Sequence, residues 1–261
     1  MYLFDSDISM KSNGGSGFRG EVSPNWSVNG NPDGGYLMSM LANAMLMKSD
    51  KQATPIFTAN FISRSVPGEA DLMVTRIAES SQFNRFDASL IQEGKEKVRM
   101  LGTFVKKAEA CFVERYEARE PGIEPREECM AFPELPGYSL FSGMELRMDP
   151  SCTGWLKNEL AEISEQKGWI RFRDGRPFDM LSLPLVADAF PPAVLASQGM
   201  VAWVPTIEMT INIRNIPESQ WLKCFFRTRY ITCGLLEEDG EIWDEQGNLV
   251  AISRQIAQYR K

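Results

Sequence analysis

Apolar and polar positions divide the chain into two runs, each of which predicts one helix and a set of strands. In the first run, residues 36–47 are rich in Leu, Met and Ala over a length too great for a strand, and they predict a helix. Short strands are predicted before this helix, at residues 17–22 and 26–28. Alternating segments bounded by turn residues follow it and predict an antiparallel meander, over residues 54–63, 71–80, 83–92 and 97–107.

The second run repeats this order. Residues 179–190 predict a helix, in which either Ser182 caps the helix with Pro184 in its first turn or the helix kinks at Pro184. Strands are predicted before this helix at residues 139–147 and 168–173, and after it at residues 203–213, 221–232, 235–243 and 249–258. Two copies of a helix laid on an antiparallel sheet are therefore expected.

Residue identities support an internal repeat. At an offset of 150 positions, Pro55, Arg64 and Pro67 fall on Pro205, Arg214 and Pro217. In the helices the offset becomes 145, which pairs residues 42–45 with residues 187–190. We therefore expect an α+β protein of two tandem halves, residues 1–107 and 140–261, joined by a linker at 108–139 with few periodic apolar positions.

Composition narrows the possible chemistry. The chain has 28 Lys and Arg against 35 Asp and Glu, a net charge of −7, so we expect no nucleic-acid partner. It contains no histidine, which excludes Ser-His-Asp and Cys-His nucleophile systems, histidine zinc sites and histidine bases. Its five cysteines form no C-x-x-C pair, and we expect neither a metal nor a cofactor. Because the opening residues lack a signal-peptide pattern and no 18 apolar residues run together, we expect a cytoplasmic protein without a membrane span.

Asp188 interrupts the apolar face of the second predicted helix. It shares that face with Leu181 and Leu185, the side expected to pack against the sheet. Desolvation there would raise the pKa of the carboxyl and make it a better base. The alternative is that Asp188 lies at a frayed helix end, solvated or capping.

Four stretches resemble the acyl-CoA thioesterase II family and its double-hotdog relatives. They are NGNPDGGYLMSMLANAM near the start, RPFDMLSLPLVADAFPPAV, WVPTIEMTINIR and LLEEDGEIWDEQGNLVAISRQIA. The resemblance implies a double hotdog fold and a hydrolytic water held and activated by an Asp on the second helix, a Thr on the next strand and a Gln on the last strand. In this sequence those positions are Asp188, Thr206 and Gln255.

The strand patterns agree with this assignment in part. Gln255 alternates in phase with the small residues Ala251, Ser253 and Ala257, a face on which a helix can pack closely and where an amide needs a hydrogen-bond partner. Alternation alone places Thr206 on the side that faces water. In the first half, the matching positions are Asn43, Ile56 and a residue within 103–105, none of which keeps the chemistry. One catalytic set per chain is therefore expected.

Other polar and flexible positions allow two interpretations each. Gly34 and Gly35 open the first helix, where free N–H groups favour an oxyanion, although a Gly pair is also ordinary turn chemistry. The arginines at 171, 173 and 176 either meet phosphates or form a solvated edge. The methionines at 38, 40, 45 and 47 either fill the core or line an acyl tunnel.

The sequence thus predicts hydrolysis of a fatty acyl-CoA to a fatty acid and coenzyme A, in lipid metabolism. Asp188 would act as the base, and Gly34 and Gly35 would contact the thioester carbonyl. The alternative is a catalytically silent hotdog protein that binds acyl-CoA or an acyl carrier. A homodimer is possible, and the sequence does not indicate the acyl chain length.

Overall fold

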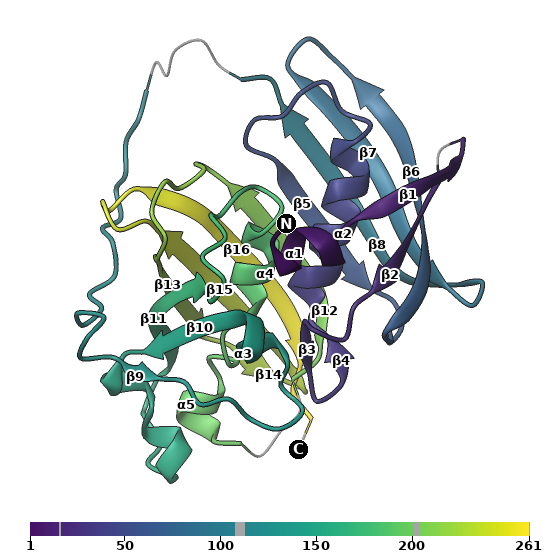
Figure 1. Cartoon of the computed structure of the whole chain (residues 1–261). Coiled ribbons are helices and arrows are strands. Elements are labelled where there is room, and N and C mark those ends of the chain that lie inside the picture. The colour runs from purple at the N-terminus through teal and green to yellow at the C-terminus, as the bar shows by residue number, and fades with distance from the viewer. Residues whose placement is uncertain (16, 108–112, 201–203, 261) are drawn as a thin grey trace.

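The computed structural model of the chain describes residues 1–15, 17–107, 113–200 and 204–260 (Figure 1). All its strands except β3 and β4, which pair with each other, form one continuous antiparallel sheet. The first half comprises α1 (Leu3–Asp7), β1 (Met10–Gly14), β2 (Gly17–Val22), β3 (Ser27–Val28), β4 (Asn31–Pro32), α2 (Gly34–Leu46), β5 (Ile56–Phe61), β6 (Gly68–Glu79), β7 (Phe83–Gln92) and β8 (Lys95–Val105). The second half comprises β9 (Met130–Ala131), α3 (Leu140–Gly143), β10 (Met144–Met148), two short 3-10 turns (Pro150–Cys152 and Gly154–Lys157), β11 (Ser164–Phe172), α4 (Leu183–Asp188), α5 (Leu195–Gln198), β12 (Thr206–Ile213), β13 (Leu222–Thr228), β14 (Ile231–Thr232), β15 (Leu235–Trp243) and β16 (Leu249–Gln258).

The strand order is the same in the two halves and mirrored about their junction. It runs β2-β6-β7-β8-β5 in the first half and β11-β13-β15-β16-β12 in the second, with β5 paired to β12. Ala59 lies opposite Met209 at this junction, which corresponds to the offset of 150 found in the sequence. The structure therefore confirms two tandem helix-on-sheet halves in an α+β protein.

Helix α2 lies at the centre of the molecule, against the strands of its own half and against α4 (Figure 1). Its side chains are buried on nearly every side, as expected of a helix that is apolar all round. Asp33 caps it by accepting a hydrogen bond from the N–H of Tyr36 at 2.9 Å. A Cβ atom at Gly35 would lie 2.1 Å from the carbonyl oxygen of Pro184, so glycine is what allows α2 and α4 to approach so closely.

The second helix is shorter than the sequence predicts. Residue 179 begins a turn in which the Asp179 carboxylate accepts the N–H groups of Leu181 and Ser182, and α4 starts only at Leu183. Pro184 occupies the first turn of α4, where its missing N–H costs nothing, so the structure agrees with the first of the two alternatives and not with a kink. Ser182 is the N-cap residue, although its side chain makes no capping hydrogen bond. The prolines at 191 and 192 then follow its C-terminal end.

Three predicted strands also differ from the structure. The segment 139–147 begins with the short helix α3, because strand β10 starts only at residue 144. The segment 221–232 divides into β13 and β14, which residues 229 and 230 separate. Residue 203, where another strand was predicted to begin, lies outside the described residues, and β12 starts at Thr206.

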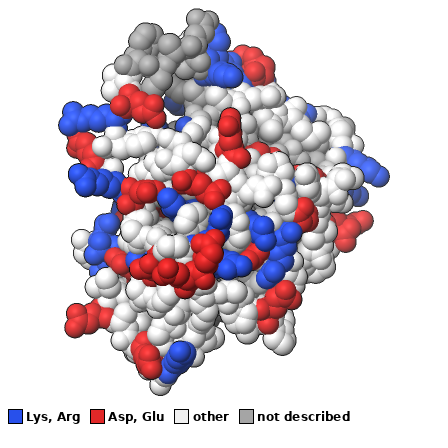
Figure 2. All heavy atoms as spheres, turned by 60° about the vertical axis from the view of Figure 1, so that its left-hand side comes forward, with Lys and Arg blue, Asp and Glu red and all other residues white. Residues whose placement is uncertain are grey.

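The described residues of the predicted linker, 113–139, run along the outside of the second half (Figure 1). Its residues 108–112 lie outside the described part of the chain, whereas its residues 130–131 form β9 and extend the sheet beyond β10. Arg126 lies over the ring of Trp221 at 5.2 Å from the centroid and binds Glu245 at 2.8 Å. Basic and acidic side chains are interspersed on the face that Figure 2 presents.

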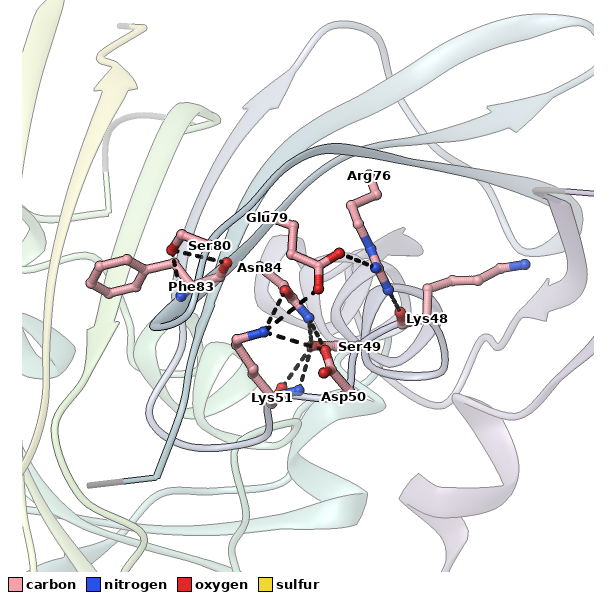
Figure 3. A network of polar contacts seen from close by, with 9 residues as sticks. All are labelled: Lys48, Ser49, Asp50, Lys51, Arg76, Glu79, Ser80, Phe83 and Asn84. Atoms are coloured by element: carbon pink, nitrogen blue, oxygen red, sulfur yellow. Dashed lines mark hydrogen bonds and ion pairs between the residues drawn. The ribbon is translucent and has the colours of Figure 1, made fainter. Parts of the chain in front are cut away.

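A polar cluster ties the C-terminal end of α2 to the β6–β7 turn (Figure 3). The Lys51 ammonium is buried and donates to the Asn84 side chain at 3.0 Å, while Asn84 donates to the Ser49 hydroxyl at 3.2 Å. Glu79 lies 4.0 Å from the same ammonium. These contacts compensate the buried charge of Lys51 and hold the C-terminal end of α2 in place. Among the described residues, no helix is both long enough and apolar enough to cross a membrane.

Candidate active site

A cavity of about 930 Å³ opens between the two halves. Its polar lining comes from both of them and includes Asp33, Gly34, Asp188, Thr206, Glu238 and Gln255. Most of the remaining lining is apolar and includes Leu37, Phe61, Phe132, Phe141, Trp155 and Phe190. A volume of this size with a few convergent polar groups is typical of a site for a small ligand.

Asp188 is the last residue of α4 and faces the N-terminal end of α2. Its Oδ2 atom accepts a hydrogen bond from the N–H of Gly35 at 3.0 Å. The carboxylate of one half therefore lies at the positive end of the helix dipole of the other half. A Cβ atom at Gly34 would lie 2.8 Å from this same oxygen, so the glycine leaves room for the carboxylate.

Burial raises the pKa of Asp188 to about 6, although the N–H groups of Gly35 and Gly34 stabilise the ionised form. The pKa of the neighbouring Asp33 is raised well above its ordinary value by burial and by the charge of Asp188. Two adjacent carboxyls that cannot both ionise easily divide into one acid and one base. Burial and the negative charge of each neighbour therefore disfavour ionisation of both carboxyls at once.

Thr206 and Gln255 meet on neighbouring strands of the same sheet. The Thr206 hydroxyl donates to Oε1 of Gln255 at 2.9 Å, and both side chains line the cavity. The alternation that placed Thr206 toward water was wrong, because the β12–β16 register shifts between Thr206 and Glu208. Ile207 is the extra residue of a β-bulge, which turns Thr206 to the inner face shared by Met209 and Gln255.

Glu238 on β15 is a further carboxylate of the site, which the sequence analysis did not identify. Its side chain is 4% exposed and accepts hydrogen bonds from Nε2 of Gln255 at 2.7 Å and from the N–H of Ala193 at 2.5 Å. Burial raises the pKa of Glu238 to about 7. A signal existed in the sequence, because Glu238 alternates in phase with Leu236 and Ile242 on the buried face of its strand.

The register identifies the first-half counterparts of these residues. Ala59 pairs with Met100 as Met209 pairs with Gln255, so the counterpart of Gln255 is Met100 and not a residue within 103–105. Met100 in turn pairs with Ala88, the counterpart of Glu238. Asn43, which matches Asp188, donates to the carbonyl of Ile8 at 2.9 Å beneath the segment that follows α1. The first half therefore holds no second copy of the polar arrangement.

The remaining sequence candidates lie as follows. Gly34 lines the cavity, and the N–H of Gly35 is occupied by Asp188. The three arginines bind protein groups: Arg171 pairs with Glu145, Arg173 donates to the carbonyl of Phe141, and the buried Arg176 pairs with Asp5 and Asp179. The methionines at 38, 40 and 45 are buried in the core, Met47 is exposed, and none of the four lines the cavity. Within the described ranges, no group of three or more Cys, Asp or Glu side chains is arranged to hold a metal ion.

Two family models match successive parts of the chain. Residues 22–105 match the acyl-CoA thioesterase N-terminal domain, and residues 119–259 match the acyl-CoA thioesterase C-terminal domain. An uncharacterized protein of Mycobacterium tuberculosis strain H37Rv is 23% identical over 92% of this chain and 90% of its own length.

Solved structures share the fold over the whole chain. A protein of Thermobifida fusca provisionally identified as a thioesterase II superposes with a TM-score of 0.91 at 24% identity, covering 100% of this chain and 98% of its own. A hot dog protein of unknown function from Alicyclobacillus acidocaldarius reaches 0.90 at 18% identity, covering 100% and 99%. An acyl-CoA thioesterase II of Mycobacterium marinum reaches 0.78 at 16% identity, covering 99% and 98%. The double hotdog fold expected from the resemblance is thereby confirmed.

Proposed function

The chain belongs to the acyl-CoA thioesterase family, and from this premise we propose that it hydrolyses fatty acyl-CoA thioesters to a carboxylic acid and coenzyme A. The observation that carries the proposal is the pairing, at one cavity, of a carboxylate whose pKa is about 6 with a hydrogen-bonded Thr and Gln. A carboxylate that titrates there is ionised at neutral pH and basic enough to draw a proton from water.

In the proposed reaction, a water held by Thr206 and Gln255 gives a proton to Asp188 while its oxygen bonds to the thioester carbonyl carbon. The tetrahedral intermediate then expels the sulfur, the C–S bond breaks, and Asp188 returns the proton to the leaving thiolate. Gly34 lines the cavity and contacts the thioester in this proposal. The N–H of Gly35 already holds the base, so its part is to orient Asp188.

The cavity lining supports an acyl substrate. Its apolar part includes Phe132 of the linker and Phe141 of α3, whose ring centroids lie 4.8 Å apart. Burying an alkyl chain there contributes about 0.8 kcal/mol per methylene. Arg64 and Arg260 also line the cavity, and they offer positive charge to the phosphates of coenzyme A on a chain whose net charge is −7.

The test is thiol release from acyl-CoAs of two to eighteen carbons, followed with a thiol reagent, with acyl groups on a carrier protein as a second panel. We expect release that depends on chain length and is lost in Asp188→Asn. Glu241→Gln is the matched control, because Glu241 lies on the outer face of β15 and is not among the residues that line the cavity. Binding of the thioesters without release from any of them would favour the catalytically silent protein and refute the proposal.

A further inference from the structure

A chain of hydrogen bonds runs from the backbone of one loop to the cavity. The N–H of Ala193 donates to Glu238, Nε2 of Gln255 donates to the other oxygen of Glu238, and Thr206 donates to Oε1 of Gln255. The distances along it are 2.5, 2.7 and 2.9 Å. Glu238, Gln255 and Thr206 all line the cavity, and Glu238 is the most deeply buried of the three.

The chemistry of the groups gives this chain a direction. An ionised carboxylate can only accept hydrogen bonds, whereas a Gln amide can present either its oxygen or its nitrogen. Both oxygens of Glu238 accept hydrogen bonds in the structure, which is the arrangement of its ionised form. In that form Gln255 must turn its nitrogen inward, which leaves Oε1 facing Thr206. The hydroxyl of Thr206 then donates its hydrogen bond to Gln255. The lone pairs of the Thr206 oxygen remain free to accept a hydrogen bond from a ligand or water in the cavity.

An ionised carboxylate at position 238 is energetically unfavourable. Both of its hydrogen-bond donors are uncharged, and the nearby carboxylate of Asp188 disfavours its ionisation. The corresponding site of the first half is filled by Ala88, beside Met100, and both are buried without any polar contact of the side chain. Packing alone therefore does not call for a carboxylate on this strand.

We propose that Glu238 is a positioning residue that fixes the amide of Gln255 and, through it, the hydroxyl of Thr206 as an acceptor for the attacking water. The water then donates one hydrogen bond to Thr206 and one to Asp188, and a lone pair of its oxygen is left to attack the carbonyl carbon while Asp188 takes up one proton. This inference rests on the proposed thioester hydrolysis and adds to it the acceptor that sets the polarity of the site.

The first variant is Glu238→Gln, which keeps the size and shape of the side chain but removes the oxygen that accepts from Gln255. Its amide can accept from Ala193 only by turning its nitrogen toward Gln255, which must then reverse and donate to Thr206. We expect kcat to fall about 10- to 100-fold, as for other misplaced reacting groups, with KM within about twofold of the wild-type value. Glu241→Gln, on the outer face of the same strand, should keep the wild-type kcat and KM.

The double variant Glu238→Gln, Gln255→Glu separates polarity from structural damage. Here the amide at 238 donates to a carboxylate at 255, the reverse of the wild-type bond, but the carboxylate again accepts the Thr206 hydroxyl. The wild-type orientation of Thr206 is therefore restored. We expect its kcat to exceed that of Glu238→Gln by about threefold or more, the coupling typical of residues in one network. Thermal unfolding of all three variants checks that each is folded.

The outcomes distinguish the two proposals. A wild-type protein that hydrolyses no thioester refutes the proposed function. An active wild type together with an unchanged kcat in Glu238→Gln overturns only the role of Glu238. So does a double variant that is no more active than Glu238→Gln, because reversal of the amide would then not be the cause of the loss.

Discussion

Replacing Asp188 by Asn should abolish activity and at the same time stabilise the protein. The amide keeps an oxygen for the N–H of Gly35, which now donates at 3.0 Å, so the junction of α2 with α4 is preserved. It cannot accept a proton as a base, and we expect turnover to fall at least about 100-fold, the lower range for loss of a general base.

The stabilisation follows from the raised pKa of Asp188. Because the carboxyl has a pKa of about 6 in the folded protein against an ordinary value of 3.8, the folded state binds more protons than the unfolded state between these two pH values. Stability therefore falls as the pH rises through this window and is level above it, and the full difference corresponds to about 3 kcal/mol. Since the side chain is partly open to the cavity, we expect about 2 kcal/mol, or about 4–8 °C in Tm.

The assay is thermal unfolding of wild type and Asp188→Asn at pH 4 and pH 8, beside acyl-CoA turnover at pH 8. We expect the variant to unfold at a higher temperature at pH 8 and at nearly the wild-type temperature at pH 4. Wild-type turnover in the variant would refute the role of base. A variant that is less stable than wild type at pH 8 would refute the argument that the ionised carboxylate of Asp188 lowers the stability of the folded protein.

Three further results are expected. For wild type, log kcat/KM should fall with a slope near one as the pH drops below about 6, where Asp188 takes up a proton, and a flat profile down to pH 4 would contradict this. Gly35→Ala should lower the urea unfolding free energy by about 2 kcal/mol or more, since its Cβ would lie 2.1 Å from the Pro184 oxygen, whereas Gly122→Ala, with open space around its Cβ, should not. A slowly hydrolysed thioester analogue should label one site per chain, and two sites would show that the first half is also active.

Much of the fold could be predicted from periodicity and from the repeat. Helix α2 and the meander β5 to β8 follow apolar patterns that tertiary packing reinforces. The second helix could not be delimited in this way, because its length depends on side-chain capping by Asp179 and on Pro184. Helix α1 was not predicted, since its five residues are too few to show a period and its Phe4 is buried only by distant elements.

In the site, too, some features could be predicted from neighbouring residues, whereas others depend on how distant strands pair. Asp188 could be singled out because a charge interrupts an apolar stripe, and that signal needs only the sequence around it. The orientation of Thr206 depends on a bulge in β12, which is visible only once β16 is paired with it. The match of Gln255 with Met100 likewise needed the register of two strand pairs, because the offset of the repeat changes between elements.

The position of the site explains why the halves have different chemistry. Asp188, the proposed base, comes from α4 of the second half, but the Gly35 N–H that it accepts comes from α2 of the first half. The two meet because glycine lets the helices touch. If the two halves were identical chains of a dimer, each chain would have to keep both a base and a glycine-rich helix start. In one polypeptide the first half is released from this constraint. Its counterparts of the proposed catalytic and positioning residues are Asn43, Ile56, Ala88 and Met100, of which Ala88 and Met100 pack in the core instead.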